Sequence, residues 1–201
     1  MFRYRDTLPG EQRAELNRNR RPPLPELVLE TSLSVGIYLD LLTDAGHHAD
    51  AAAVTTAIQT GVRAAVDTVQ SWVGEKMRPP VRLDIDCTYC RHSGSRTDLS
   101  RPHLHLQVST IATDQHGREH TVNRDLLRMS GPVAQVQFAQ RAAAEIEAVT
   151  DARFVPAQTA TRWEIAGLTD LAERTERWGC RATSALTQWY PLDKLDGIRT
   201  A

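Results

Sequence analysis

The 201-residue chain lacks a long apolar run and has few cysteines and aromatic residues. No stretch approaches the roughly 20 apolar residues that a transmembrane helix needs, so we expect no membrane partner. The first ten residues, MFRYRDTLPG, hold no apolar core of the kind found in secretory signals, which predicts a cytoplasmic protein. The three cysteines, Cys87, Cys90 and Cys180, are too few for a disulfide framework, so we expect free thiols.

The chain also lacks a strong charge of either sign. It has 24 basic and 25 acidic residues, which give a formal net charge of −1. This balance excludes a strong overall field that would draw the protein onto nucleic acid. Lys76 and Lys194 are the only lysines, so the other basic residues are arginines. Contacts with nucleic acid would therefore have to come from local arginine patches.

The distribution of polar and apolar residues predicts one domain between two polar ends. Residues 1–25 form an arginine-rich arm that ends in Pro22-Pro23-Leu24-Pro25, because this proline run cannot continue a helix. Residues 26–190 form the domain, and residues 191–201 form a C-terminal tail.

The spacing of apolar residues predicts the elements of that domain. Intervals of three and four predict a helix over 50–73. The alanine-rich segment 132–149 is a second predicted helix and 168–186 a last helical region, while residues 35–42 fit a helix or a short turn. Alternation predicts strands over 26–32, 81–87, 103–111, 119–122, 154–155 and 162–165. These elements predict an α/β (α+β) fold, in which a mainly antiparallel central sheet has helices packed on one face.

Three of the seven histidines lie close together in RHSGSRTDLSRPHLHLQVST. Residues two apart on a strand point the same way, so His103 and His105 project from the face opposite the apolar side chains. His92 ends the preceding strand and has the parity of Cys90, so it could supply a third imidazole. Three imidazoles with water at the open positions commonly hold a catalytic divalent metal. The spacing therefore predicts a metal site at His92, His103 and His105.

Other interpretations of these residues remain open. A surface strand can carry histidines simply because it is polar. A single Cys87-Thr88-Tyr89-Cys90 pattern is weak evidence for structural zinc, since it has no second pair and its cysteines have opposite parities. Three imidazoles do not choose among zinc, manganese, magnesium, nickel, iron and copper. Asp84, Asp86 and Ser109 are available as outer partners of the metal ligands.

The segment CRHSGSRTDLSRPHLHLQVSTIATDQHGREH resembles the core of the TrwC-type conjugative relaxases, members of the HUH endonuclease superfamily. That core has a histidine before a Thr/Ser-Ser-Arg turn, a His-x-His on the next strand and an Asp-Gly-like turn. Upstream, the resemblance includes the family's opening strand in PELVLETSLSVG. Downstream, it includes the helix, hairpin and helix that follow the metal strand, in VQFAQRAAAEIEAVTDARFVP and TRWEIAGLTDLAERTERWGCRATS. The resemblance spans about residues 25–190 and implies a relaxase-like fold.

The resemblance allows two assignments of the metal ligands. Matching the letters of PHLHLQV places the strand ligands at His105 and Gln107, whereas matching the spacing gives His92, His103 and His105 without a gap. We prefer the spacing, because an imidazole binds a metal better than a carboxamide does. Gln107 remains the alternative ligand.

The resemblance implies that a divalent metal polarises a phosphate of single-stranded DNA while a tyrosine attacks it. Glu26 stands where the family has an acidic residue that helps to take the tyrosine proton. Tyr4 is the only tyrosine ahead of Glu26, but its context does not match the family's tyrosine motif. Arg91 and Arg96 are candidate contacts to the nucleic acid or substrate.

Three hypotheses follow for the function. The first is a relaxase-like metal-binding protein that binds, and in an active form nicks, single-stranded DNA. The second is a relaxase fold repurposed as a metal-dependent small-molecule enzyme that lacks the nicking tyrosine. The third is a non-catalytic remnant whose histidines are only polar strand residues. The sequence leaves catalysis itself and the oligomeric state undetermined.

Overall fold

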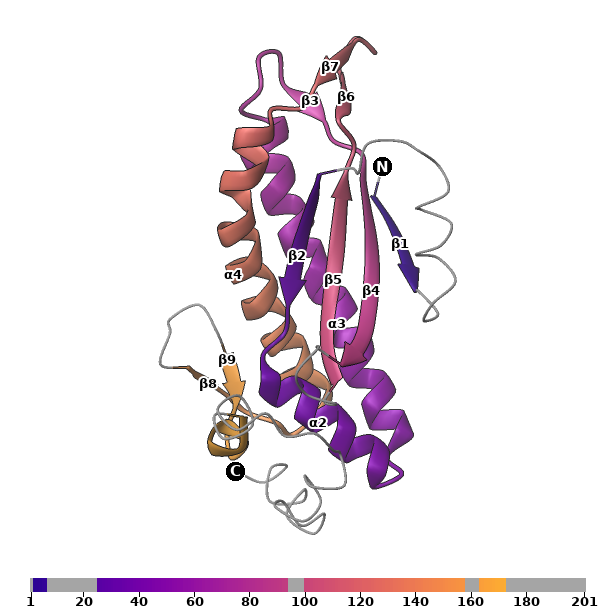
Figure 1. Cartoon of the computed structure of the whole chain (residues 1–201), viewed down its shortest axis with the longest axis vertical. Coiled ribbons are helices and arrows are strands. Elements are labelled where there is room, and N and C mark those ends of the chain that lie inside the picture. Colours follow the sequence, from indigo (N-terminus) through magenta and orange to yellow (C-terminus); the bar gives the residue numbers. More distant parts are fainter. Residues whose placement is uncertain (1, 7–24, 94–99, 158–162, 173–201) are drawn as a thin grey trace. The chain divides into compact units, whose positions relative to one another are not determined.

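The computed structural model describes residues 2–6, 25–93, 100–157 and 163–172 (Figure 1). For residues 2–6, 92, 93 and 100 it describes the backbone alone. The chain forms two compact units. The first comprises Met1–Leu29, Ala64–Cys90 and His103–Gln137, and the second comprises Glu30–Arg63, Arg91–Pro102 and Phe138–Ala201.

A four-stranded sheet with the order β1-β4-β5-β2 is the main sheet (Figure 1). Its strands are β1 (Phe2–Asp6), β2 (Glu26–Glu30), β4 (Ile85–Ser93) and β5 (Ser100–Val108). The arrows of β4 and β2 run opposite to that of β5 in Figure 1, whereas β1 pairs with β4 in parallel. The mixed α/β class and the mainly antiparallel sheet are confirmed. β1 lies inside the segment predicted to be a polar arm.

In the first unit, helical residues cover one side of this sheet. Gly131 of α4 (Arg124–Val149) lies against Leu27 of β2, and an added Cβ there would be 3.3 Å from a Leu27 methyl. The core consists of apolar side chains from the sheet and from the helical segments, namely Leu29, Ala65, Val66, Val69, Val73, Val81, Leu83, Ile85, Cys87, Tyr89, Leu104, Leu106, Val108, Ala112, Val122, Leu127 and Ala134.

A second sheet in the first unit has the order β3-β6-β7. It consists of β3 (Val81–Arg82), β6 (Ile111–Asp114) and β7 (Glu119–Thr121). The predicted strand 81–87 is therefore two strands, since β3 pairs with β6 whereas β4 begins at Ile85. The side chain of Gln70, in the π-helical turn η1 (Gln70–Gly74), fixes this break by bonding to the Val81 carbonyl and the Leu83 N–H, each at 2.9 Å.

Asp114 organises the turn between β6 and β7. Its carboxylate accepts hydrogen bonds from the backbone N–H groups of His116 and Arg118, and its Oδ2 lies 2.9 Å from Arg118 Nε and 3.0 Å from His120 Nε2. Burial opposes ionisation of Asp114, but these bonds outweigh it and hold the pKa of Asp114 below its usual range. Gly117 completes the turn with a φ of 77°.

The second unit contains α2 (Leu33–Asp44), the first part of α3 (His48–Val69) and the last part of α4. It also contains the hairpin of β8 (Phe154–Pro156) and β9 (Trp163–Ile165). The buried Glu164 of β9 accepts a hydrogen bond from the Ser34 N–H at the start of α2, and the Ser34 hydroxyl accepts one from the Ile165 N–H. The helix and the hairpin are therefore joined by buried polar contacts.

The alanine-rich helix α4 begins at Arg124, ahead of the start predicted at Pro132. Asn123 supplies the earlier start, because its side-chain oxygen accepts hydrogen bonds from the N–H groups of Asp125 and Leu126. Pro132 is tolerated inside the helix at an exposed position. The end of the last predicted helix, 168–186, lies outside the described residues beyond Ala172.

Among the described residues, no helix combines the length and the apolar character required to span a membrane.

We predict that Gly61→Ala lowers the free energy of unfolding by about 1–3 kcal/mol. An added Cβ at Gly61 of α3 would lie 2.9 Å from the N, Cα and Cβ atoms of Ala142 in α4, which cannot move without shifting the helix. The control is Gly131→Ala, where only the flexible Leu27 side chain is near and helix propensity favours alanine by up to about 1 kcal/mol. Denaturant titration of both variants tests this. Equal stabilities would contradict the close packing of the two helices.

Asp114→Asn is expected to destabilise the protein at neutral pH, because a neutral amide cannot replace the carboxylate at its four hydrogen-bonding partners. A carboxyl whose pKa is lowered on folding contributes stability above its unfolded pKa, of about 3.9, and loses it as the pH falls towards the folded value. The melting temperatures of wild type and variant should therefore differ at pH 7 and converge only below about pH 4. A constant difference across this range would refute the role of the charge.

Candidate metal centre

The alternation of β5 places its histidines on the side opposite the core. Leu104, Leu106 and Val108 are fully buried. His103, His105 and Gln107 have the other parity and face away from these side chains. The two imidazole rings contact each other edge to face, with centroids 5.0 Å apart and an interplanar angle of 61°. The prediction that His103 and His105 share the polar face of a strand is confirmed.

The edge strand β2 brings Glu26 to this face. Val108 N–H bonds to the Pro25 carbonyl, and Thr31 N–H bonds to the Pro102 carbonyl, which sets the antiparallel register of β2 and β5. Glu26 lies diagonally across from His105 in this register, and its Oε1 is 2.9 Å from His105 Nδ1. We assign the Nδ1–H tautomer to His105 from this contact, which leaves Nε2 free as a metal donor.

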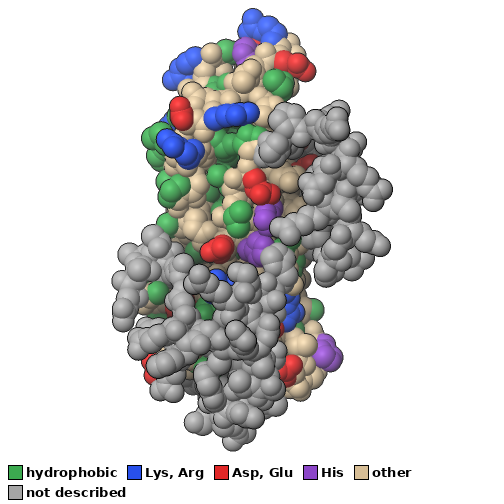
Figure 2. Space-filling model, viewed as in Figure 1, with side chains coloured by type: hydrophobic (Ala, Val, Ile, Leu, Met, Phe, Trp, Pro, Cys, Tyr) green, Lys and Arg blue, Asp and Glu red, His purple; other side chains and the backbone are tan. Residues whose placement is uncertain are grey.

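A group of metal-binding side chains forms where β4 and β5 adjoin. One ligand atom each from Cys90, His103 and His105 lies within 4.8 Å of the others. His105 has 26% of its side chain exposed and Glu26 has 39%, so the group is reachable from solvent. Figure 2 shows histidine side chains gathered beside acidic ones on this face. Two imidazoles and a thiol are suitable donors for a borderline or soft divalent metal.

The two cysteines of the Cys-x-x-Cys pattern lie on opposite faces of the sheet. Cys87 is completely buried in the core. Burial, reinforced by the nearby Cys90, raises the pKa of the Cys87 thiol to about 12, so it stays protonated. Cys90 has the parity of the metal face and is only partly buried. The pattern is therefore not a paired structural zinc site within β4.

The remaining predicted site residues differ in how much of each the structure describes. Gln107 shares the face of His103 and His105. The backbone of His92 belongs to β4, but its side chain lies outside the described residues, as does the whole of Arg96. The backbone of Tyr4 pairs with the buried Cys87, and its side chain is likewise outside them.

Arg91, which we predicted to contact nucleic acid or substrate, is bound within the second unit. Its guanidinium lies 3.2 Å from the Asp40 carboxylate of α2 and 3.4 Å from the Thr43 hydroxyl. The Asp40 side chain is only 10% exposed, whereas that of Arg91 is 30% exposed, so the carboxylate is the shielded member of this ion pair. The arrangement gives Arg91 a structural role in holding the end of β4 to α2.

The chain matches solved structures of the relaxase TrwC in complex with DNA. One contains mutant oriT DNA, with a TM-score of 0.56, 14% identity, 86% coverage of this chain and 74% of that chain. Another contains a 27-mer DNA with the recognition hairpin and the cleavage site. It matches with a TM-score of 0.58 and 13% identity, over 87% of this chain and 64% of that chain. A metal-bound complex with oriT DNA matches with a TM-score of 0.55 and 12% identity, over 87% of this chain and 68% of that chain.

The chain has a relaxase-like fold. No protein-family profile matches it, and no curated protein matches it either. At 12–14% identity the likeness concerns the fold, and the predicted membership of the TrwC-type family stays a prediction.

Sequence reasoning did not assign Cys90 as a ligand, although the signal was present. Cys90 was recognised as having the parity of His92, and it lies two residues before it on the same strand. The prediction used His92 instead, because three imidazoles commonly hold a divalent metal. Glu26 was predicted as an acidic catalytic residue, and the structure places its carboxylate on an imidazole of the metal group.

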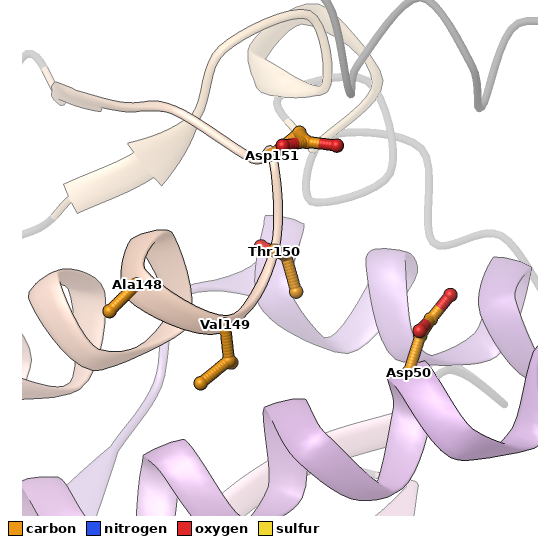
Figure 3. A pocket seen from close by; sticks show the side chains of 5 residues that line it. All are labelled: Asp50, Ala148, Val149, Thr150 and Asp151. Atoms are coloured by element: carbon orange, nitrogen blue, oxygen red, sulfur yellow. The ribbon is translucent and has the colours of Figure 1, made fainter.

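A cavity in the second unit is lined by Asp50 of α3 and by Ala148–Asp151 at the end of α4 (Figure 3). Its volume is about 400 Å³. It offers carboxylates without an imidazole or a thiol, and the carboxylates come from different elements. Nothing among its lining side chains resembles the donor set on β4 and β5.

We predict that Glu26→Gln weakens metal binding by roughly 10–100-fold, because an imidazole that loses its carboxylate partner is less basic and less well oriented. The control is Glu119→Gln, since Glu119 is an exposed carboxylate of β7. Competition with a chromophoric chelator gives both dissociation constants. Equal affinities of the two variants would show that Glu26 does not support His105.

Proposed function

We propose that this chain binds one divalent metal ion through His103 and His105 with a third donor from β4, and that it uses this site to bind single-stranded DNA. The observation that carries the proposal is the grouping of Cys90, His103 and His105 on the polar face of a relaxase-like sheet. TrwC structures of this fold are complexes with DNA, including one described as metal-bound.

The residues of the site have separate tasks under this proposal. When bound, the metal supplies a Lewis acid and an attachment point for a phosphodiester oxygen. His103 and His105 hold its position, and Glu26 keeps His105 in the tautomer that presents Nε2. The exposed parts of His105 and Glu26 keep the site in contact with solvent, as the binding of DNA requires.

Nicking by Tyr4 remains a separate proposal. Attack by a tyrosine oxygen on the phosphate forms the new ester, and the 3′ oxygen leaves with a proton while the tyrosine proton passes to a base. Glu26 is the base that the family resemblance implies. The backbone of Tyr4 lies in β1, where it pairs with Cys87 of β4. The metal group and the DNA-bound TrwC structures support DNA binding, so binding rather than cleavage is proposed as the main function.

A repurposed metal-dependent small-molecule enzyme is the second candidate. Two observations favour it: the net charge of −1 and the engagement of Arg91 with Asp40. Both reduce the cationic surface available to a polyanion. In this case the metal group acts on a small substrate, and the protein carries metal but does not retain DNA.

The test measures metal content and binding of a fluorescent single-stranded oligonucleotide for wild type, His103→Ala and the control His48→Ala, whose imidazole is exposed in α3. Wild type and the control should carry about one metal per chain and lose affinity steadily as salt rises. His103→Ala should lose more metal affinity than the roughly 10–100-fold expected for an outer partner, and DNA binding should fall with it.

Metal without DNA binding in wild type would favour the small-molecule enzyme. The absence of metal from wild type would overturn both candidates and leave the polar remnant. A covalent protein–DNA adduct that Tyr4→Phe abolishes would establish Tyr4 as the nucleophile.

A further inference from the structure

The metal group contains a donor that three imidazoles would not include. Cys90 has a ligand atom within 4.8 Å of those of both His103 and His105, although its neighbour in the sequence pattern, Cys87, points into the core. The strand parity explains this, since Cys90 lies three residues after Cys87 and therefore faces the other way. The sulfur belongs to the site by its position on β4.

We infer that Cys90 is a metal ligand and that its thiolate makes the site select thiophilic divalent ions such as zinc over magnesium and manganese. The inference rests on the proposed metal site and specifies which class of metal it takes. Thiolates select zinc and other soft or borderline ions, whereas magnesium and manganese prefer carboxylate, carbonyl and water oxygens.

The spacing of the donors suits this class of ion. Zinc–sulfur bonds of about 2.3 Å and zinc–nitrogen bonds of about 2.0–2.1 Å place tetrahedral donors roughly 3.3–3.6 Å apart. The ligand atoms of Cys90, His103 and His105, all within 4.8 Å, can reach this spacing through small side-chain movements. Three protein donors also leave a fourth tetrahedral position, which is the pattern of zinc sites that bind substrate.

A cysteine thiolate in place of one imidazole lowers the net charge of the metal-loaded site. A thiolate and two neutral imidazoles leave a divalent ion with one net positive charge, against two for three imidazoles. The carboxylate of Glu26, hydrogen-bonded to His105, reduces the local charge further. The site therefore holds its metal more tightly but attracts an anionic phosphodiester less strongly than a three-histidine site would.

The inference is tested by metal titrations of four proteins: wild type, Cys90→Ser, Cys90→His and the control Cys87→Ala. Cobalt(II) serves as the spectroscopic probe because its bond to a thiolate produces a near-ultraviolet charge-transfer band. Wild type and Cys87→Ala should show this band, whereas Cys90→Ser and Cys90→His should not. Circular dichroism verifies that each variant is folded.

Affinities supply the second measurement. Zinc should bind Cys90→Ser at least about 10-fold more weakly than wild type, while the weak affinity for manganese stays within about 3-fold, so that the preference for zinc falls. Cys90→His should recover zinc binding without the charge-transfer band. This recovery separates the loss of a ligand from a loss of folding.

Two contrary results have different meanings. Wild type that binds cobalt without the charge-transfer band, or zinc affinity unchanged in Cys90→Ser, would overturn the role of Cys90 and leave the metal site with another third donor. Wild type that binds none of these metals would overturn the inference together with the proposed function.

Discussion

The two-residue alternation of β4 and β5 is the constraint on which the rest of the structure depends. One set of side chains, including Cys87, Leu104 and Leu106, is withdrawn from water into the core of the first unit. Burial of each larger apolar side chain contributes about 1.5–3 kcal/mol to the free energy of folding. Because a slip by one residue would expose this whole set, burial fixes the register of both strands. The opposite set must then share one polar face. A shift by one residue would send both histidines into the core.

The contact between Glu26 and His105 prepares this polar face for binding a metal. The edge strand β2 supplies the carboxylate through a cross-strand diagonal, and hydrogen bonds at both ends of β2 hold it there. A carboxylate on one imidazole nitrogen orients the other toward a metal. The relaxase-like fold thus provides position, while the donor set determines which chemistry the position supports. The sulfur of Cys90 distinguishes this donor set from three imidazoles.

Sequence patterns predicted the class of the fold and the shared face of His103 and His105, because both depend on periodicity within one segment. They did not predict that β1 joins the sheet, since a polar strand in parallel pairing carries no local signal. They placed the start of α4 at Pro132, whereas the cap at Asn123 begins it earlier. Proximity across strands, as between Glu26 and His105, depends on a register that only the folded chain defines.

X-ray absorption at the zinc edge of the zinc-loaded protein tests the central claim most directly, because it reports the atoms bound to the metal without requiring a substrate. The account predicts imidazole nitrogen and one sulfur in the coordination shell, with zinc–sulfur at about 2.3 Å and zinc–nitrogen at about 2.0–2.1 Å. A shell of oxygen atoms alone, with neither imidazole nor sulfur, would contradict the assignment of the polar face of β4 and β5 as a metal centre.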